Sequence, residues 1–451
     1  MKNNILYRIL IMLVGVTVML ACDPTLHLGV DIPAPGHTSP RTESHRMENH
    51  EVRNVLLLYS AGYNSLSGYL SEDMEDLING DLPGPGRMDD VLLIYSHQPS
   101  RKSAYAVQTS PVLIRVYKDI DDSVVRDTLV VYPKGSISSS ATQLNKVLSY
   151  VNDNYPAKTY GMIFSSHATG YLPTGFYSNP KGYTYAPSMV MSCPGTEVDA
   201  PRGAPYVAPE HDPSLPMVKS VGQDQVGSYG SYISYEIQIE DFAEALPMYM
   251  DYILFDACLM GGVEVAYELA GKVGLVGFSQ TEVLAEGFDY KTLTMHLLNG
   301  GEPDPVAVCM DYFHQYDIQS GVMRSATISV VDCNRLEPLA DVCSDVFRNY
   351  RGAIGVLKAT QVQRYFRGDS HWFYDLVDIV EMAGVDDVRV RALKEAVDNC
   401  IVYKAATQSF MGSFDITAYS GFSMYLPSNG NLELDKYYRT LKWNIATGLI
   451  Q

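Results

Sequence analysis

The clearest information on the fold comes from two short stretches, residues 160–166 (YGMIFSS) and residues 252–256 (YILFD). Each is a nearly continuous apolar run of strand length. Residues 54–60 (NVLLLYS) and residues 90–96 (DVLLIYS) repeat the pattern, and helical stretches lie between the runs. Apolar strands that alternate with helices are typical of a parallel sheet covered on both faces. We therefore predict a three-layer α/β fold with a mostly parallel central sheet.

Further elements are predicted around these strands. Residues 138–152 form a predicted helix, because their apolar residues recur on one face and Ser138 or Ser139 can cap its start. Residues 171–232 are rich in Gly, Pro, Ser and Tyr and form a predicted long insertion, which acts as a lid, a self-processing segment or a surface decoration. The other predicted elements are a helix at 71–79, a hairpin at 113–118 and 128–132, and strands at 274–280, 327–331 and 421–426.

The first fifty residues predict export and anchoring. Residues 1–21 combine a short charged start with an apolar core, which is typical of a signal peptide and shorter than a membrane span. Cys22 stands where bacterial lipoproteins carry their lipidated cysteine, whereas plain secretion would make this cysteine incidental. Residues 23–50 contain four prolines and four histidines and form a predicted flexible tether. We expect an exported lipoprotein of the bacterial cell envelope, held to the membrane by its lipid, with the membrane face left open.

Composition limits the classes of partner. The 451 residues carry 52 acidic and 33 basic side chains, a net charge of −19, and 46% of them are hydrophobic. The apolar content suffices for a large core, and the negative charge disfavours nucleic acid and favours basic peptides. No His or Cys cluster in the sequence has metal-ligand spacing, so we predict no metal site. Six cysteines besides Cys22 permit disulfides but form no disulfide framework.

A histidine and a cysteine follow the apolar stretches 160–166 and 252–256. His167 comes directly after residues 160–166, and Cys258 lies two residues beyond the end of residues 252–256. If these strands are neighbours, both side chains emerge at the sheet edge where ligands bind. A nearby His can hold the thiolate of a nucleophilic Cys and return a proton to the leaving amine. The residues thus predict a Cys–His dyad; a structural histidine and a buried core cysteine are the competing interpretation.

Asp256 adds a prediction about specificity. It stands two residues before Cys258, so the two side chains share a face if the strand continues. A carboxylate beside a peptide-binding slot would bind an Arg or Lys side chain of the substrate through a charge-assisted pair. The competing interpretation is that Asp256 hydrogen-bonds to nearby loop backbone.

At this point the sequence resembles a known family. Residues 251–290, with D-A-C-L-M before a helix containing E-V-A-Y-E-L, resemble the nucleophile region of clostripain-family cysteine peptidases of clan CD. Residues 162–170 (MIFSSHATG) resemble the family's histidine strand, and residues 54–66 and 421–427 its first and a late strand. The resemblance implies a caspase-like three-layer α/β/α sandwich and a peptidase domain over residues 51–451.

The resemblance also implies the activity and its residues. It implies hydrolysis of peptide bonds after Arg or Lys in protein or peptide substrates. Cys258 would be the nucleophile and His167 the base, with the backbone N–H groups of Cys258 and Ala168 as oxyanion donors. Asp256 and Asp289 would bind the substrate. No cofactor is required; calcium dependence occurs in the family, although the sequence holds no D-x-D-x-D-G loop. Family members often cut themselves in the loop after the histidine, where the candidates are Lys181, Arg202 and Lys219.

Three residues depart from the family pattern. Ala168 replaces the usual Gly after the histidine, Tyr63 replaces an Asp in an early turn, and Phe288 replaces a Trp. The first change could lower activity by moving an oxyanion donor. It supports an alternative function, a catalytically inactive caspase-like envelope lipoprotein that binds peptide or glycan. A purely structural protein would make both His167 and Cys258 accidental within their motifs.

Overall fold

The computed structural model describes residues 52–64, 66–98, 109–177, 179–186, 215, 216, 218, 224–228, 231–368 and 371–451, with only the backbone at 224–228 and 231–235. All of these belong to the unit His50–Gln451. The predicted signal peptide, Cys22 and the predicted tether lie outside the described residues. Within the described ranges, no helix has the length and apolar character that a membrane span requires.

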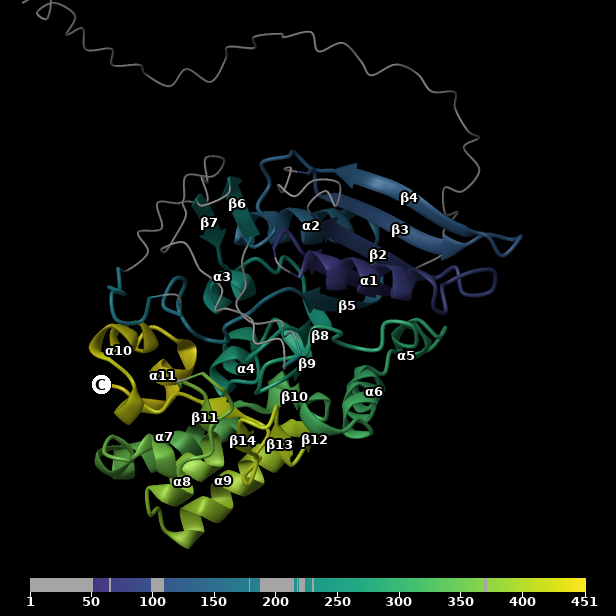
Figure 1. The fold of residues 1–451 in the computed structure, drawn as a ribbon. Coiled ribbons are helices and arrows are strands. Elements are labelled where there is room, and N and C mark those ends of the chain that lie inside the picture. The colour runs from purple at the N-terminus through teal and green to yellow at the C-terminus, as the bar shows by residue number, and fades with distance from the viewer. Residues whose placement is uncertain are drawn as a thin grey trace, which may run out of the picture. The chain divides into compact units, whose positions relative to one another are not determined.

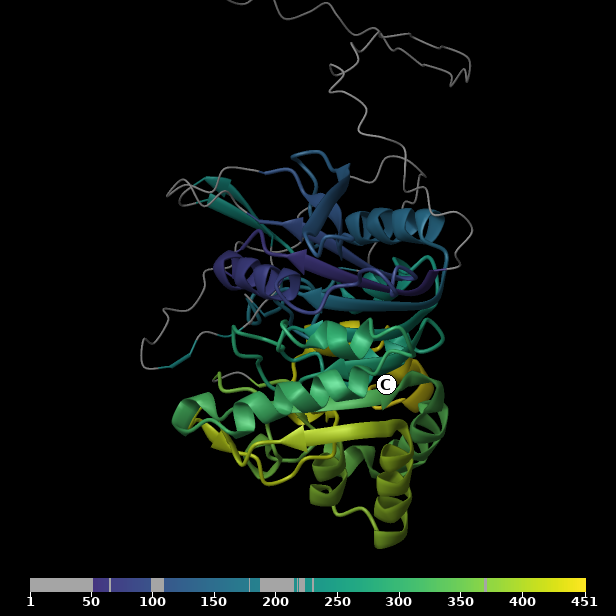
Figure 2. The ribbon, with the colours of Figure 1, turned by 90° about the vertical axis from the view of Figure 1, so that its right-hand side faces the viewer.

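The described residues form a nine-stranded sheet in the order β12-β10-β9-β8-β5-β1-β2-β3-β4. The five central strands pair in parallel, and the strands toward each edge pair antiparallel. Figure 2 shows the strands one above another, from the blue strands of the first half to the yellow-green strands of the second. The predicted three-layer fold with a mostly parallel sheet is therefore confirmed. The strands are β1 (Val52–Ala61), β2 (Asp90–His97), β3 (Val112–Lys118), β4 (Val124–Val131), β5 (Ala157–Ser165), β8 (Met250–Asp256), β9 (Val273–Phe278), β10 (Thr327–Asp332) and β12 (Ile401–Ala406).

Helices cover both faces of this sheet (Figure 1). On one face, Phe242 of α3 (Ile239–Glu244) packs edge-on against Phe164 of β5, with ring centroids 5.2 Å apart. On the other face, α6 (Pro305–Asp317) brings Cys309 against Gly277 of β9, which leaves no room for a larger side chain at that glycine. The other helices are α1 (Ser67–Ile78), α2 (Ala141–Asn154), α4 (Val263–Leu269), α5 (Leu293–Leu297), α7 (Glu337–Ile354), α8 (Leu376–Met382), α9 (Asp387–Cys400), α10 (Leu432–Tyr438) and α11 (Lys442–Thr447).

Two local predictions need correction. The helix predicted at 138–152 is α2, and its cap is Ser140, whose hydroxyl accepts the backbone N–H of Gln143 at 3.2 Å. Ser138 does not cap it because its hydroxyl bonds instead to Tyr95 and His97. The strand predicted at 421–426 contains only β15 (Ser423–Met424), which pairs with β11 (Tyr374–Asp375) outside the central sheet.

The predicted insertion has described structure near both of its ends. Tyr171, Leu172 and Phe176 are buried, and the Tyr171 hydroxyl donates to the carbonyl oxygen of Trp372 at 2.5 Å. Near its other end, the chain forms a small hairpin of β6 (Asp224–Ser228) and β7 (Ser231–Tyr235). A second small hairpin elsewhere joins β13 (Ser409–Phe410) and β14 (Phe414–Asp415).

Candidate active site

The two strands that carry His167 and Cys258 are neighbours. Strands β5 and β8 run parallel, and their last paired residues are Ser165 and Asp256. His167 and Cys258 each follow two residues later, so both emerge from the same edge of the sheet. The predicted dyad required β5 and β8 to be neighbouring strands, and the structure meets this condition.

The turns that follow these strands touch each other. Gly170, three residues after the histidine, has a φ of 60°, and a Cβ at this position would lie 2.4 Å from the carbonyl oxygen of Leu259. Leu259, next to the nucleophile candidate, has a φ of 62°, which is uncommon for a residue with a side chain and costs conformational energy. Its N–H donates to the carbonyl oxygen of Thr281 at 2.9 Å, which helps to hold this conformation. The strained turn at residues 258–260, the nucleophile turn, therefore packs directly against residues 167–170, the histidine loop.

The Cys258 thiol is fully buried and faces the segment after β9. Its sulfur accepts the backbone N–H of Val283 at 3.0 Å and lies 3.7 Å from the carbonyl oxygen of the same residue. A thiol with no exposed surface cannot meet a substrate, so attack requires a local rearrangement around Cys258.

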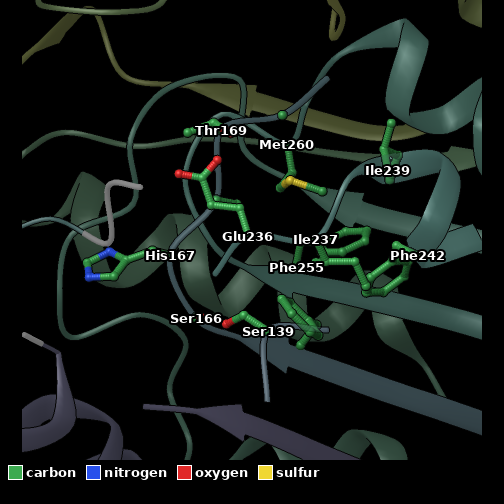
Figure 3. Close-up of a pocket in the computed structure, with 13 residues that line it drawn as sticks. Ser139, Ser166, His167, Thr169, Glu236, Ile237, Ile239, Phe242, Phe255 and Met260 are labelled. Atoms are coloured by element: carbon green, nitrogen blue, oxygen red, sulfur yellow. The ribbon is translucent and has the colours of Figure 1, made fainter. Parts of the chain in front are cut away.

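A cavity lies beside His167 (Figure 3). The histidine loop contributes His167, Ala168 and Gly170, and the nucleophile turn contributes Met260, so both loops border one space. The His167 side chain is only 8% exposed, and Ala168 is half-buried. The loop from His167 to Gly170 therefore borders a small, partly open space, and Figure 3 shows the imidazole on the side away from the apolar side chains.

Asp256 lies fully buried beneath the nucleophile turn. Its Oδ2 accepts the hydroxyl of Ser165 at 2.9 Å and that of Tyr290 at 2.6 Å. Burial, with a further effect of Asp256 itself, raises the pKa of Tyr290 well above its usual range, so Tyr290 remains a donor to this carboxylate. Both of these partners are hydroxyl side chains. A basic substrate side chain reaches Asp256 only if these neighbours move.

Glu282 is a further candidate functional residue, which was not predicted from the sequence. It stands next to Val283, is 2% exposed, and its carboxylate pairs with Arg367, Nε to Oε2, at 2.8 Å. Burial raises the pKa of Glu282, and the charge of Arg367 opposes this effect. The sequence feature that could have indicated Glu282 is its position, two residues after the predicted strand at 274–280. The buried carboxylate of Glu282, next to Val283, therefore already binds the guanidinium group of Arg367.

The remaining predicted residues lie apart from the cavity or outside the description. Asp289 is half-buried in the turn before α5, where its carboxylate accepts the N–H of Lys291 at 3.2 Å. It is not one of the residues that line the cavity beside His167. Lys181 lies on the surface of the described segment 179–186. Arg202 and Lys219 lie outside the described residues, and none of these assignments is tested.

A sheet of this topology, with a histidine and a cysteine at the ends of adjacent parallel strands, defines the class of caspase-like cysteine peptidases. Within that class the chain belongs to the clostripain family, whose model matches residues 58–188 and 208–447. It is a cysteine endopeptidase that acts on peptide substrates. No curated protein matches the chain.

Solved structures of the same family share the fold. An inactive zymogen of a C11 protease from Parabacteroides distasonis is 25% identical, with a TM-score of 0.67, and the match covers 89% of this chain and 99% of that one. A secreted C11 cysteine protease from Bacteroides thetaiotaomicron is 21% identical with a TM-score of 0.66, over 88% and 99% of the two chains. A secreted C11 cysteine protease from the same organism, bound to an irreversible peptide inhibitor, is 24% identical with a TM-score of 0.65, also over 88% and 99%.

Proposed function

We propose that this cysteine endopeptidase cleaves after Arg or Lys, with Cys258 as nucleophile and His167 as its proton-transfer partner. The observation that carries the proposal is the parallel pairing of β5 with β8, which ends at Ser165 and Asp256 and leaves both side chains at one edge. The contact between Gly170 and Leu259 supports the same juxtaposition.

The proposed reaction has two steps. His167 takes the thiol proton, and the Cys258 thiolate attacks the carbonyl carbon of the scissile bond. The backbone N–H groups of Cys258 and Ala168 are the proposed donors to the oxyanion. The C–N bond then breaks, and His167 returns its proton to the leaving amine. Water, deprotonated by His167, hydrolyses the thioester and restores the thiol.

Basic specificity is proposed to come from the carboxylate of Asp256. In the structure its Oδ2 accepts two hydroxyl hydrogen bonds, and a guanidinium or ammonium group of the substrate would pair with the same carboxyl group. Asp289 is the second proposed contact, although it lies in a separate turn. A cofactor is not expected, and a role of calcium is left open: within the described ranges, no group of three His, Cys, Asp or Glu side chains could hold a metal ion. We therefore assign no residue to calcium.

The buried thiol favours synthesis as a precursor. Cys258 is engaged with Val283 in the intact chain, so we propose that a cut in the insertion lets the nucleophile turn rearrange. Lys181, Arg202 and Lys219 are the proposed sites. The Parabacteroides relative is described as an inactive zymogen, which is consistent with this proposal.

The dyad is tested with fluorogenic peptides that end in Arg, Lys, Leu or Asp. We expect hydrolysis of the Arg and Lys peptides by the chain after activation, and loss of at least about a thousandfold in Cys258→Ala and His167→Ala. Cys400→Ala and His296→Ala are matched controls, because these residues lie on α9 and α5, outside the cavity. Asp256→Asn should lower kcat/KM mainly for basic peptides. Equal activity in Cys258→Ala, or no activity after any cut, would favour the catalytically inactive binder.

We further propose that the chain is exported and lipidated on Cys22. The support is the charged and apolar start of the sequence, with Cys22 directly after Leu20 and Ala21. The secreted Bacteroides relatives are consistent with export. Metabolic labelling with a fatty-acid analogue should mark the native chain but not Cys22→Ala; equal labelling of both would contradict the anchor.

A further inference from the structure

The cavity beside His167 has an apolar interior. Phe164 of β5 and Phe255 of β8 are paired in register, and Phe242 of α3 packs on both, with ring centroids 5.2 and 5.5 Å away. Figure 3 shows Phe242, Phe255 and Ile239 grouped on one side of the space and His167 on the other. Ile237 and Met260 complete the apolar lining.

This cavity lies on the opposite face of the sheet from Asp256. Consecutive side chains of a strand point to opposite faces. Phe164 and Phe255 immediately precede Ser165 and Asp256, which are themselves paired and hydrogen-bonded. The carboxylate proposed to bind the basic residue before the scissile bond is thus separated by the sheet from the apolar space. A single substrate side chain cannot occupy both places.

The reaction determines which substrate residue lies beside the histidine. The imidazole must give its proton to the nitrogen of the leaving amine, so that nitrogen lies within hydrogen-bond reach of His167. The side chain of the leaving residue starts one carbon from this nitrogen. His167, Ala168 and Gly170 line the cavity, so this side chain starts at the cavity's edge.

Charge at the cavity restricts what can enter it. Glu236 lines the space between His167 and the apolar side chains, and its carboxylate accepts the N–H of Gly175 at 2.8 Å. An acidic substrate side chain would lose its hydration here and face this carboxylate. An aliphatic side chain instead gains free energy by leaving water.

We propose that this cavity is the specificity pocket for the residue directly after the scissile bond, and that it selects an aliphatic side chain such as Leu or Val. The inference rests on the proposed dyad, since it is His167 that fixes the position of the leaving nitrogen. It gives the enzyme a second specificity determinant besides the basic residue: an Arg or Lys before the cut and an aliphatic residue after it.

The test uses internally quenched peptides that are identical except for the residue after a single Arg. We expect the activated chain to cleave the Leu and Val peptides at least about tenfold faster, in kcat/KM, than the Gly peptide, and the Asp peptide slowest. Values within twofold across Leu, Val, Gly and Asp would overturn the inference. This series needs no variant, and failure to cleave any Arg peptide would overturn the proposed function together with the inference.

A cavity-filling variant gives an independent check. Ile237→Trp should lower kcat/KM for the Leu peptide about tenfold while changing that for the Gly peptide less than about threefold. Ile318→Trp is the matched control, since Ile318 is 66% exposed at the end of α6. An equal loss for both peptides in Ile237→Trp would contradict a pocket for this side chain.

Discussion

Replacing Glu264 by Gln should change how the stability of the protein depends on pH. Glu264 lies in the first turn of α4, directly after the nucleophile turn, and is fully buried. Its Oε1 accepts the backbone N–H of Tyr425 and the hydroxyl of Tyr438, each at 2.8 Å. Gln keeps an oxygen acceptor of the same shape at this position but cannot ionise.

The size of the effect follows from the pKa of Glu264. Burial raises this pKa from an ordinary value of 4.5 to about 7, and the two hydrogen bonds oppose the shift. The unfolded chain therefore loses this proton near pH 4.5, whereas the folded chain keeps it until near pH 7. Between these values the folded state binds more protons, so stability falls as the pH rises. At about 1.4 kcal/mol per pKa unit, the loss reaches about 3 kcal/mol above pH 7.

Urea unfolding at pH 4.5, 6 and 8 measures this difference. Relative to the unsubstituted chain, Glu264→Gln should gain about 3 kcal/mol of unfolding free energy between pH 4.5 and pH 8. Glu286→Gln is the matched control, because Glu286 is exposed, and it should show no such gain. If the curves of Glu264→Gln and the unsubstituted chain stay parallel across this range, the reasoning about the buried carboxylate is wrong.

Three further substitutions test single contacts. Gly170→Ala should lower activity more than tenfold and stability by about 2 kcal/mol, because its Cβ would meet the Leu259 carbonyl oxygen at a positive φ; full activity would refute the tight contact between the two loops. Tyr290→Phe should lower the unfolding free energy by about 2 kcal/mol, since it removes a 2.6 Å hydrogen bond to the buried Asp256, and an unchanged urea midpoint would argue against that bond. Ser140→Ala should cost about 1 kcal/mol by removing the cap of α2, and no change in the urea midpoint would show that another group caps the helix.

The central strands could be predicted because their burial is visible in the sequence. Residues 54–60, 90–96, 160–166 and 252–256 are apolar almost without interruption, and each falls in a strand of the parallel centre, except that Ser166 follows the end of β5. Such runs are needed only where helices cover both faces of a sheet. The expectation that His167 and Cys258 emerge at the ends of their strands followed from the same pattern, because chemistry in open α/β sheets lies at the carboxyl ends of the strands.

Contacts between segments distant in sequence could not be predicted. Tyr290 meets Asp256 across 34 residues, and the Val283 backbone meets the Cys258 sulfur across 25. The spacing of apolar residues in a sequence indicates a strand or a helix, but it does not determine which loop folds over the edge of the sheet. The prediction of the α2 cap was wrong for a related reason. Ser138, Ser139 and Ser140 are the same residue type, so the sequence does not distinguish them as caps. The contacts of Ser138 with Tyr95 and His97 are visible only in the structure.

Labelling by an irreversible peptide inhibitor that ends in Lys tests whether Cys258 and His167 act together. The activated chain should carry the adduct on Cys258, located by peptide mass mapping, and His167→Ala should react at least about a hundredfold more slowly. His296→Ala should react at the normal rate. An adduct on any other residue, or an unchanged rate in His167→Ala, would contradict the proposed dyad.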